Sequence, residues 1–201
     1  MKTYIIGSGY LSSELKRKLS NSFIYNARDF LDVVDEINKT SFDTKVNLII
    51  NSFYSVKKLN KIDSYNFFFK KSIIEISSIL DKIDSKIINK IIYTSSSSVY
   101  GSIDNKIKLD DPNNRYIYSS LKLTSETLFK NYCNKYNISL DICRIFNIYG
   151  NKDNFSIISK LISKKINKRI KINNNGSSMR DFIHIDDIVK IYKKLLDIKS
   201  S

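Results

Sequence analysis

Short apolar runs alternate with longer amphipathic segments along most of this chain, which is the pattern of βαβ units around a parallel sheet. Parallel strands are buried on both faces, so they read as continuous apolar runs. Val46-Asn-Leu-Ile-Ile50 and Lys90-Ile-Ile-Tyr-Thr94 nearly fit that pattern. The sequence therefore predicts an α/β fold with a Rossmann-like, doubly wound parallel sheet. Strands are expected near 3–6, 23–25, 46–50, 90–94 and 141–146, and helices near 10–19, 29–38, 65–83, 116–136, 155–167 and 186–196.

Only five glycines occur in the 201 residues, and all of them fall inside short motifs. Gly7 and Gly9 follow the first apolar run and precede a helical segment, so Gly7-Ser-Gly-Tyr-Leu-Ser12 is a candidate dinucleotide-binding turn. The free N–H groups of the helix N-terminus would face a pyrophosphate. Ser12 stands where a third glycine normally permits close packing of helix on strand, so we expect a slightly wider approach there.

Tyr118 and Lys122 are four residues apart on an expected helix, so their side chains project from the same face. A nearby ammonium would lower the pKa of Tyr118 from about 10 toward the working pH, where the phenol can exchange a proton with a substrate. In a chain rich in Tyr and Lys, a surface pair formed by chance is the alternative. Hydroxyl residues Ser95, Ser96 and Ser97 follow an expected strand, where parallel sheets bind ligands, although a serine-rich turn would read the same way.

Charge and composition narrow the classes of protein. The formal net charge is +14, but the lysines are spread along the chain, so we interpret them as a solvated surface and disfavour nucleic acid as a partner. No apolar stretch approaches the ~20 residues that span a bilayer, and Met1 leads directly into an expected strand, which predicts a cytoplasmic protein without a membrane partner. Cys133 and Cys143 are expected to be structural thiols.

Taken in order, five motifs resemble the extended short-chain dehydrogenase/reductase family, which comprises NAD(P)-dependent nucleotide-sugar epimerases, dehydratases and reductases. The resemblance covers essentially the whole chain, and it implies an NAD(P)-binding Rossmann domain over 1–150 and a truncated substrate-side segment over 151–201 packed on the same domain. The motifs are the glycine turn, Ser95-Ser-Ser-Ser-Val-Tyr-Gly101, Tyr118-Ser-Ser-Leu-Lys122, Arg144-Ile-Phe-Asn-Ile-Tyr-Gly150 and Arg180-Asp-Phe-Ile-His-Ile-Asp-Asp187.

The resemblance implies a role for each matching residue. Ser96 would hydrogen-bond the reacting oxygen, Tyr118 would be the acid/base, and Lys122 would hold the nicotinamide ribose while hydride moves between a sugar carbon and the nicotinamide ring. His184 would belong to a packing motif, with Asp186 and Asp187 capping the final helix, and no metal site is expected. The other expected cofactor contacts are Gly7, Gly9, Tyr10, Leu11, Arg28 and Ser95, and the expected substrate contacts are Ser97, Asn147 and Arg180, whose guanidinium would meet the nucleotide diphosphate.

Cofactor and reaction type depend on departures within the family pattern. Asn26 and Ala27 occupy the positions where NAD binders carry an acid and Arg28 follows, so NADP is modestly favoured. Ser97 and Ser98 replace the Asp-Glu pair of the 4,6-dehydratases, which favours a nucleotide-sugar epimerase over a dehydratase. An NADPH-dependent 4-keto-sugar-nucleotide reductase and a cofactor-binding but inactive member are the alternatives. Family chains usually continue past the last motif, so either this chain is a truncated product or its substrate pocket is open and partly supplied by a partner subunit. A homodimer is a candidate assembly.

Overall fold

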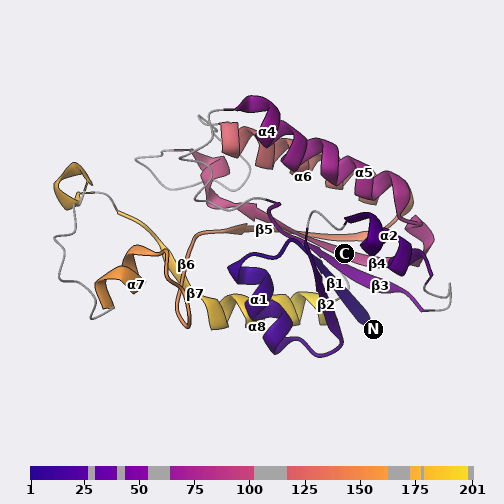
Figure 1. Ribbon diagram of the computed structural model, residues 1–201, viewed down its shortest axis with the longest axis horizontal. Helices are drawn as coiled ribbons and strands as arrows, with labels where there is room; N and C mark the ends of the chain where they lie inside the picture. The colour runs from indigo at the N-terminus through magenta and orange to yellow at the C-terminus, as the bar shows by residue number, and fades with distance from the viewer. Residues whose placement is uncertain are drawn as a thin grey trace.

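Five parallel strands form the central sheet in the order β2-β1-β3-β4-β5 (Figure 1). The computed structural model describes residues 1–26, 30–39, 44–53, 64–101, 117–162, 173–177 and 179–198. The strands are β1 (Lys2–Ile6), β2 (Ser22–Tyr25), β3 (Val46–Ile50), β4 (Ile88–Ser96) and β5 (Ser139–Ile145). Together with the helices on both faces, this sheet confirms the predicted α/β fold.

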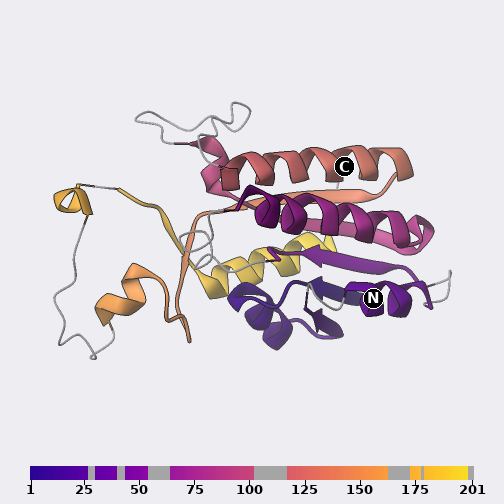
Figure 2. The same cartoon turned by 45° about the horizontal axis from the view of Figure 1, so that its top comes forward.

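Helices cover both faces of the sheet (Figures 1 and 2). One face packs against α2 (Phe30–Asn38), α5 (Glu75–Lys82) and α6 (Ile117–Tyr136), and the other packs against α1 (Tyr10–Lys18) and α8 (Ile185–Asp197). Neighbouring residues of a strand point to opposite faces, so each central strand supplies both cores. The first core contains Tyr4, Leu48, Ile91, Ile79 and Phe129, and the second contains Ile5, Ile49, Ile92, Leu15 and Ile188.

The expected elements are found, with three differences. The helix expected at 65–83 is divided into α4 (Tyr65–Phe69), a π-helical turn (Lys70–Ile74) and α5. The helix expected at 155–167 is described as α7 (Ile157–Ile162), and its remainder lies outside the described residues. Two short strands that the sequence pattern did not reveal, β6 (Asn147–Tyr149) and β7 (Phe182–His184), pair in parallel. Three residues are too few to produce a readable period.

We call the described residues of 147–162, 173–177 and 179–184, which include β6, α7 and β7, the arm. They project from the sheet on the left of Figure 1. The chain returns from the arm into α8, which packs on the sheet beside α1. The division of the chain at residue 150 stays a prediction. No described helix combines the length and the apolar character needed to cross a membrane.

Candidate active site

The order of the strands creates a binding position at one edge of the sheet. β2 lies on one side of β1 and β3 lies on the other, so the winding of the chain reverses between β1 and β3. In open α/β sheets, ligands bind outside the carboxyl ends of the strands at such a point. Gly7 follows β1 there, Ser52 follows β3 closely, and Ser96 ends the adjacent β4. The fold therefore brings the glycine turn and the serine segment together at the carboxyl ends of the strands.

The glycine turn has the shape that a dinucleotide pyrophosphate needs. Gly7 has φ +103°, and a Cβ there would lie 3.0 Å from the backbone oxygen of Ser52, so glycine is required. Gly9 caps α1, and a Cβ added to it would meet no atom within 4 Å, so the space in front of it is open. The first turn of α1 carries no acidic residue, and its free N–H groups favour an anion. Gly7 and Gly9 thus fit a pyrophosphate.

Tyr10 and Leu11 direct their side chains elsewhere. The Tyr10 hydroxyl donates to the carbonyl oxygen of Gly150 at 2.5 Å, and its ring meets Phe155 edge to face with centroids 5.3 Å apart. Desolvation, and next the charge of Glu14, raises the pKa of Tyr10 to about 12. Leu11 packs against the second core. The Tyr10 side chain therefore fastens α1 to the arm, and the backbones of both residues remain as candidate cofactor contacts.

Ser12 is accommodated by a hydrogen bond. Its side chain is fully buried, and its Oγ accepts from Asn51 Nδ2 at 2.6 Å. Asn51 Oδ1 accepts from the hydroxyl of Thr94, which lies 2.6 Å from the hydroxyl of Tyr192 on α8. The expectation of a wider helix–strand approach took no account of this partner. A chain of buried hydrogen bonds joins α1, β3, β4 and α8 where the missing glycine would stand.

Ser96 and Tyr118, which are far apart in sequence, meet in the structure. The phenol of Tyr118, near the start of α6, is hydrogen-bonded to Ser96 and also to Ser52. Ser96 Oγ accepts from the N–H of Ser98 at 3.2 Å, which holds its side chain at the start of a 3-10 turn (Ser97–Tyr100). The sequence reasoning missed Ser52. Its position after β3, at the reversal of winding, is the signal that could have found it.

Lys122 lies close to Tyr118 but does not lower its pKa as expected. The Lys122 side chain is 5% exposed, and its Nζ donates to the carbonyl oxygen of Thr94 at 2.7 Å. Nζ lies 6.0 Å from the centre of the Tyr118 ring, and desolvation lowers the pKa of Lys122 to about 7. Desolvation raises the pKa of Tyr118, whereas the hydrogen bonds from Ser52 and Ser96 act to lower it. The expected direction is therefore wrong here, because burial outweighs the favourable partners.

Ser95 points into an ion pair beneath α6. Its hydroxyl donates to Glu126 Oε1 at 2.5 Å. Arg144 donates to the same carboxylate through Nε at 3.0 Å and Nη2 at 2.8 Å, and its guanidinium lies 4.9 Å from the centre of the Tyr100 ring. The Glu126 side chain is only 1% exposed. The Ser95 hydroxyl is thus occupied within the protein, and its backbone remains as a candidate cofactor contact.

The remaining predicted site residues are the three substrate candidates, Ser97, Asn147 and Arg180, and the cofactor candidate Arg28. Ser97 begins the 3-10 turn directly after Ser96 and is partly exposed. Asn147 Nδ2 donates to the carbonyl oxygen of Asp181 at 2.9 Å, which places this substrate candidate beside the segment that leads into β7. Arg180 is exposed in that segment, and its Nη1 donates to the Met179 carbonyl at 2.7 Å. Arg28 lies outside the described residues.

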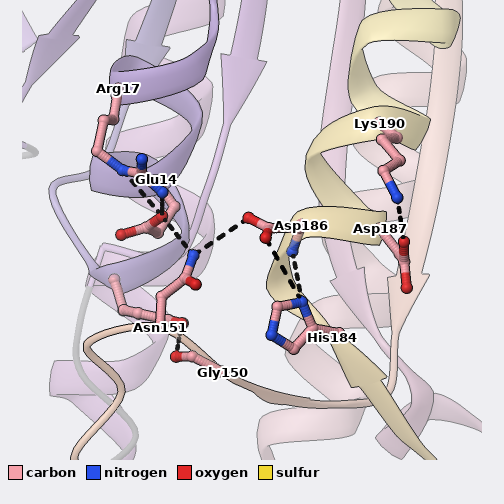
Figure 3. A network of polar contacts seen from close by, with 9 residues as sticks. Glu14, Arg17, Gly150, Asn151, His184, Asp186, Asp187 and Lys190 are labelled. Atoms are coloured by element: carbon pink, nitrogen blue, oxygen red, sulfur yellow. Dashed lines mark hydrogen bonds and ion pairs between the residues drawn. The ribbon is translucent and has the colours of Figure 1, made fainter.

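A polar network joins α1, the arm and α8 (Figure 3). Asn151 Nδ2 donates to Glu14 at 3.0 Å and to Asp186 at 3.1 Å. His184 Nδ1 accepts from the N–H of Asp186 at 3.2 Å and so caps α8, which confirms its structural role. The expectation that Asp186 and Asp187 cap α8 is wrong, because His184 is the N-cap. Both carboxylates lie in the first turn of α8, where they interact favourably with the helix dipole.

We expect Gly150→Ala to destabilise the fold. Gly150 has φ +114°, and a Cβ there would lie 2.2 Å from His184 Nε2. Backbone strain and overpacking together predict a loss of about 2–5 kcal/mol in the free energy of unfolding, measured by denaturant titration. Gly9→Ala is the matched control, since Gly9 has φ −76° and open space around its Cβ position. Equal stability of the two variants would contradict the prediction.

This chain is similar in sequence to a known protein family and to several known proteins. The model described as "NAD dependent epimerase/dehydratase family" matches residues 28–201. Protein CapI of Staphylococcus aureus is 27% identical over 96% of this chain and 62% of its own length. The ADP-L-glycero-D-manno-heptose-6-epimerase of Brachyspira hyodysenteriae is 28% identical over 92% of this chain and 68% of its own length. The chain thus spans less than two thirds of the CapI length and slightly more than two thirds of the heptose epimerase.

Two solved structures show the same fold. MoeE5 in complex with UDP-glucose and NAD is 20% identical and superimposes with a TM-score of 0.81 over 99% of this chain and 73% of MoeE5. The UDP-glucuronic acid 4-epimerase from Bacillus cereus, in complex with UDP-glucuronic acid and NAD, is 19% identical, with a TM-score of 0.76 over 100% of this chain and 74% of the epimerase.

Proposed function

Since this chain belongs to the NAD dependent epimerase/dehydratase family, we propose that it is an NAD(P)-dependent nucleotide-sugar epimerase in which Tyr118 is the acid/base. The observation that supports this proposal most is the contact of Tyr118 with Ser96. That contact lies at the carboxyl edge of the sheet, where Gly7 and Gly9 leave room for a pyrophosphate. The group that would transfer the proton and the position that would hold the cofactor therefore lie at the same edge of the sheet.

The proposed chemistry assigns one task to each side chain. When bound, NAD(P) would supply reversible hydride transfer at a sugar carbon. The Tyr118 oxygen takes the proton of the sugar hydroxyl and gives it back, and Ser96 donates a hydrogen bond to the same sugar oxygen. Lys122 lies on the same face of α6 as Tyr118, and its Nζ donates to the Thr94 carbonyl oxygen. This position suits a contact between the Lys122 ammonium and the nicotinamide ribose.

Two alternatives remain beside the epimerase. Ser97 and Ser98 offer hydroxyls where elimination of water would need a carboxylic acid, so a dehydratase is disfavoured. An NADPH-dependent 4-keto-sugar-nucleotide reductase is favoured by Arg28 alone. A cofactor-binding but inactive protein is the third candidate, and Ser12 in place of the third glycine of the turn is the feature that favours it. The oligomeric state, including a homodimer, stays a prediction.

A substrate screen separates these candidates. Purified protein is incubated with NAD or NADPH and with UDP-, GDP-, CDP- and dTDP-sugars, and the products are identified by proton NMR. An epimerase yields an inverted sugar without net consumption of cofactor, whereas a reductase consumes NADPH with a 4-keto sugar. Tight binding of cofactor without any product would support the inactive protein and reject the proposed epimerase.

We also propose a preference for NADP(H), because arginine accommodates the 2′-phosphate of the adenosine ribose. We expect tighter binding of NADPH than of NADH in fluorescence titrations, and we expect Arg28→Ala to reduce the difference. Tighter binding of NADH by the unchanged protein would reject the preference. MoeE5 and the B. cereus epimerase were solved with NAD, which gives this preference no support.

A further inference from the structure

Ser52 contacts both parts of the candidate site. Its side chain is hydrogen-bonded to the Tyr118 phenol, and its carbonyl oxygen would lie 3.0 Å from a Cβ on Gly7. Ser96, the other hydroxyl partner of Tyr118, comes from the end of the neighbouring β4. Two adjacent parallel strands therefore each present one serine hydroxyl to the same phenol.

The residue before Ser52 is anchored from three elements. Asn51 is 6% exposed, and its N–H donates to the Ile6 carbonyl of β1 at 2.9 Å. Its amide group donates to Ser12 of α1 and accepts from Thr94 of β4. These three anchors fix the backbone from which the Ser52 side chain projects.

Thr94 connects this anchor to the amine of the site. Its hydroxyl is bonded to Asn51, and its carbonyl oxygen accepts from Lys122 Nζ at 2.7 Å. The same buried network therefore positions both Ser52 and Lys122. A serine held in this way loses little backbone freedom when it donates to the phenol, because the anchored neighbour has already ordered the backbone.

We infer that Ser52 is a positioning residue for the proposed reaction: its hydroxyl donates to the Tyr118 oxygen and stabilises the deprotonated form that accepts the substrate proton. Ser52 keeps its own proton throughout, and the sugar hydroxyl loses one to Tyr118, so the step balances. This inference depends on the proposed function for its kinetic consequence. Its structural part, the contact between the two hydroxyls, does not.

Among the described residues, the charged groups near Tyr118 are few enough for a hydrogen bond from Ser52 to influence the pKa of the phenol. On α6, Lys122 Nζ lies 6.0 Å from the ring centre, and Glu126, one turn further on, is paired with Arg144. Ser52, shortly after the end of β3, and Ser96, the last residue of β4, are both neutral. Desolvation is the largest influence on the pKa of Tyr118 and raises it, so a lost hydroxyl donor leaves that rise less opposed.

The kinetic test compares Ser52→Ala with Ser52→Thr, which keeps the hydroxyl. Removing a donor to the phenolate raises the pKa of Tyr118, so the rising limb of kcat against pH should move up by about one pH unit. Below that limb kcat should fall roughly tenfold, with a smaller change in KM. Ser77→Ala is the matched control, because within the described residues the hydroxyl of Ser77, on α5, donates to the carbonyl oxygen of Ile74 in the preceding π-helical turn. It should keep the pH profile of the unchanged protein.

A second measurement decides the inference without turnover. The ζ-carbon signal of Tyr118 is recorded in protein labelled with carbon-13 tyrosine and assigned by its disappearance in Tyr118→Phe. In the cofactor-free protein, Tyr118 should ionise at higher pH in Ser52→Ala than in the unchanged protein. In Ser52→Thr the midpoint of Tyr118 ionisation should return toward its original pH. An unchanged midpoint and an unchanged rate profile would overturn the role of Ser52 while leaving the epimerase proposal intact. Absence of turnover by the unchanged protein would reject the epimerase but not this contact.

Discussion

Tyr118→Phe should lose nearly all turnover of a nucleotide sugar while binding NAD(P)H almost as tightly as the unchanged protein. Only the phenolic oxygen is removed, so the ring keeps its place beside Lys122 and the glycine turn is untouched. General acid/base groups typically contribute 10²–10⁴-fold to the rate, so kcat should fall by roughly that factor. Steady-state kinetics measures the loss, and cofactor fluorescence measures the affinity.

The matched control is Tyr132→Phe on the same helix. The hydroxyl of Tyr132 is buried, and within the described part of the chain it has no hydrogen-bond partner. Its removal should leave kcat unchanged and should not lower the melting temperature. Comparable activity of Tyr118→Phe and Tyr132→Phe would show that Tyr118 is not the acid/base, whatever reaction the protein performs.

Arg144→Met should produce the largest loss of stability. Arg144 makes two hydrogen bonds to Glu126, whose side chain is almost fully buried, so the variant leaves a carboxylate in the interior without its cation. Breaking a buried pair in this way typically costs about 3–5 kcal/mol. In a domain of this size the melting temperature should fall by roughly 6–20 °C in a thermal unfolding experiment.

Two further variants test the physical reason. Glu126→Gln in the Arg144→Met background should recover part of the stability, because a neutral amide is cheaper to bury and can still accept from Ser95. Lys190→Met removes the partner of Asp187 from a pair in which both side chains are exposed, and it should have a much smaller effect. If Arg144→Met and Lys190→Met lowered the melting temperature equally, the buried pair would not have the importance that we assign to it.

The local elements could be predicted from the sequence because each depends on the order of apolar and polar residues along one segment. Continuous apolar runs gave β3 and the centre of β4, and the glycine turn was placed between β1 and α1. The contact of Ser96 with Tyr118 was expected from the resemblance to a family, since no periodicity relates residues on different elements. The β6–β7 pair escaped prediction because its strands are too short to show a period.

Side-chain direction was decided by the tertiary structure. Tyr10 and Ser95 were expected at the cofactor, but their hydroxyls bond to Gly150 and Glu126, which other parts of the chain supply. Ser52 carries no motif of its own and becomes significant only because β3 lies between β1 and β4. Neighbours of this kind depend on strand order, which residue spacing does not specify.

By itself, the sequence determined the α/β class and the position of most helices and strands, because burial on one or both faces leaves a period in the residues. The family was indicated by the resemblance of the five motifs. The tertiary structure alone decided which hydroxyls meet at Tyr118, how Asn51 compensates for Ser12, and that the pKa of Tyr118 rises. Desolvation and hydrogen bonding depend on everything that surrounds an atom. Those surroundings exist only when the strands and helices have packed together.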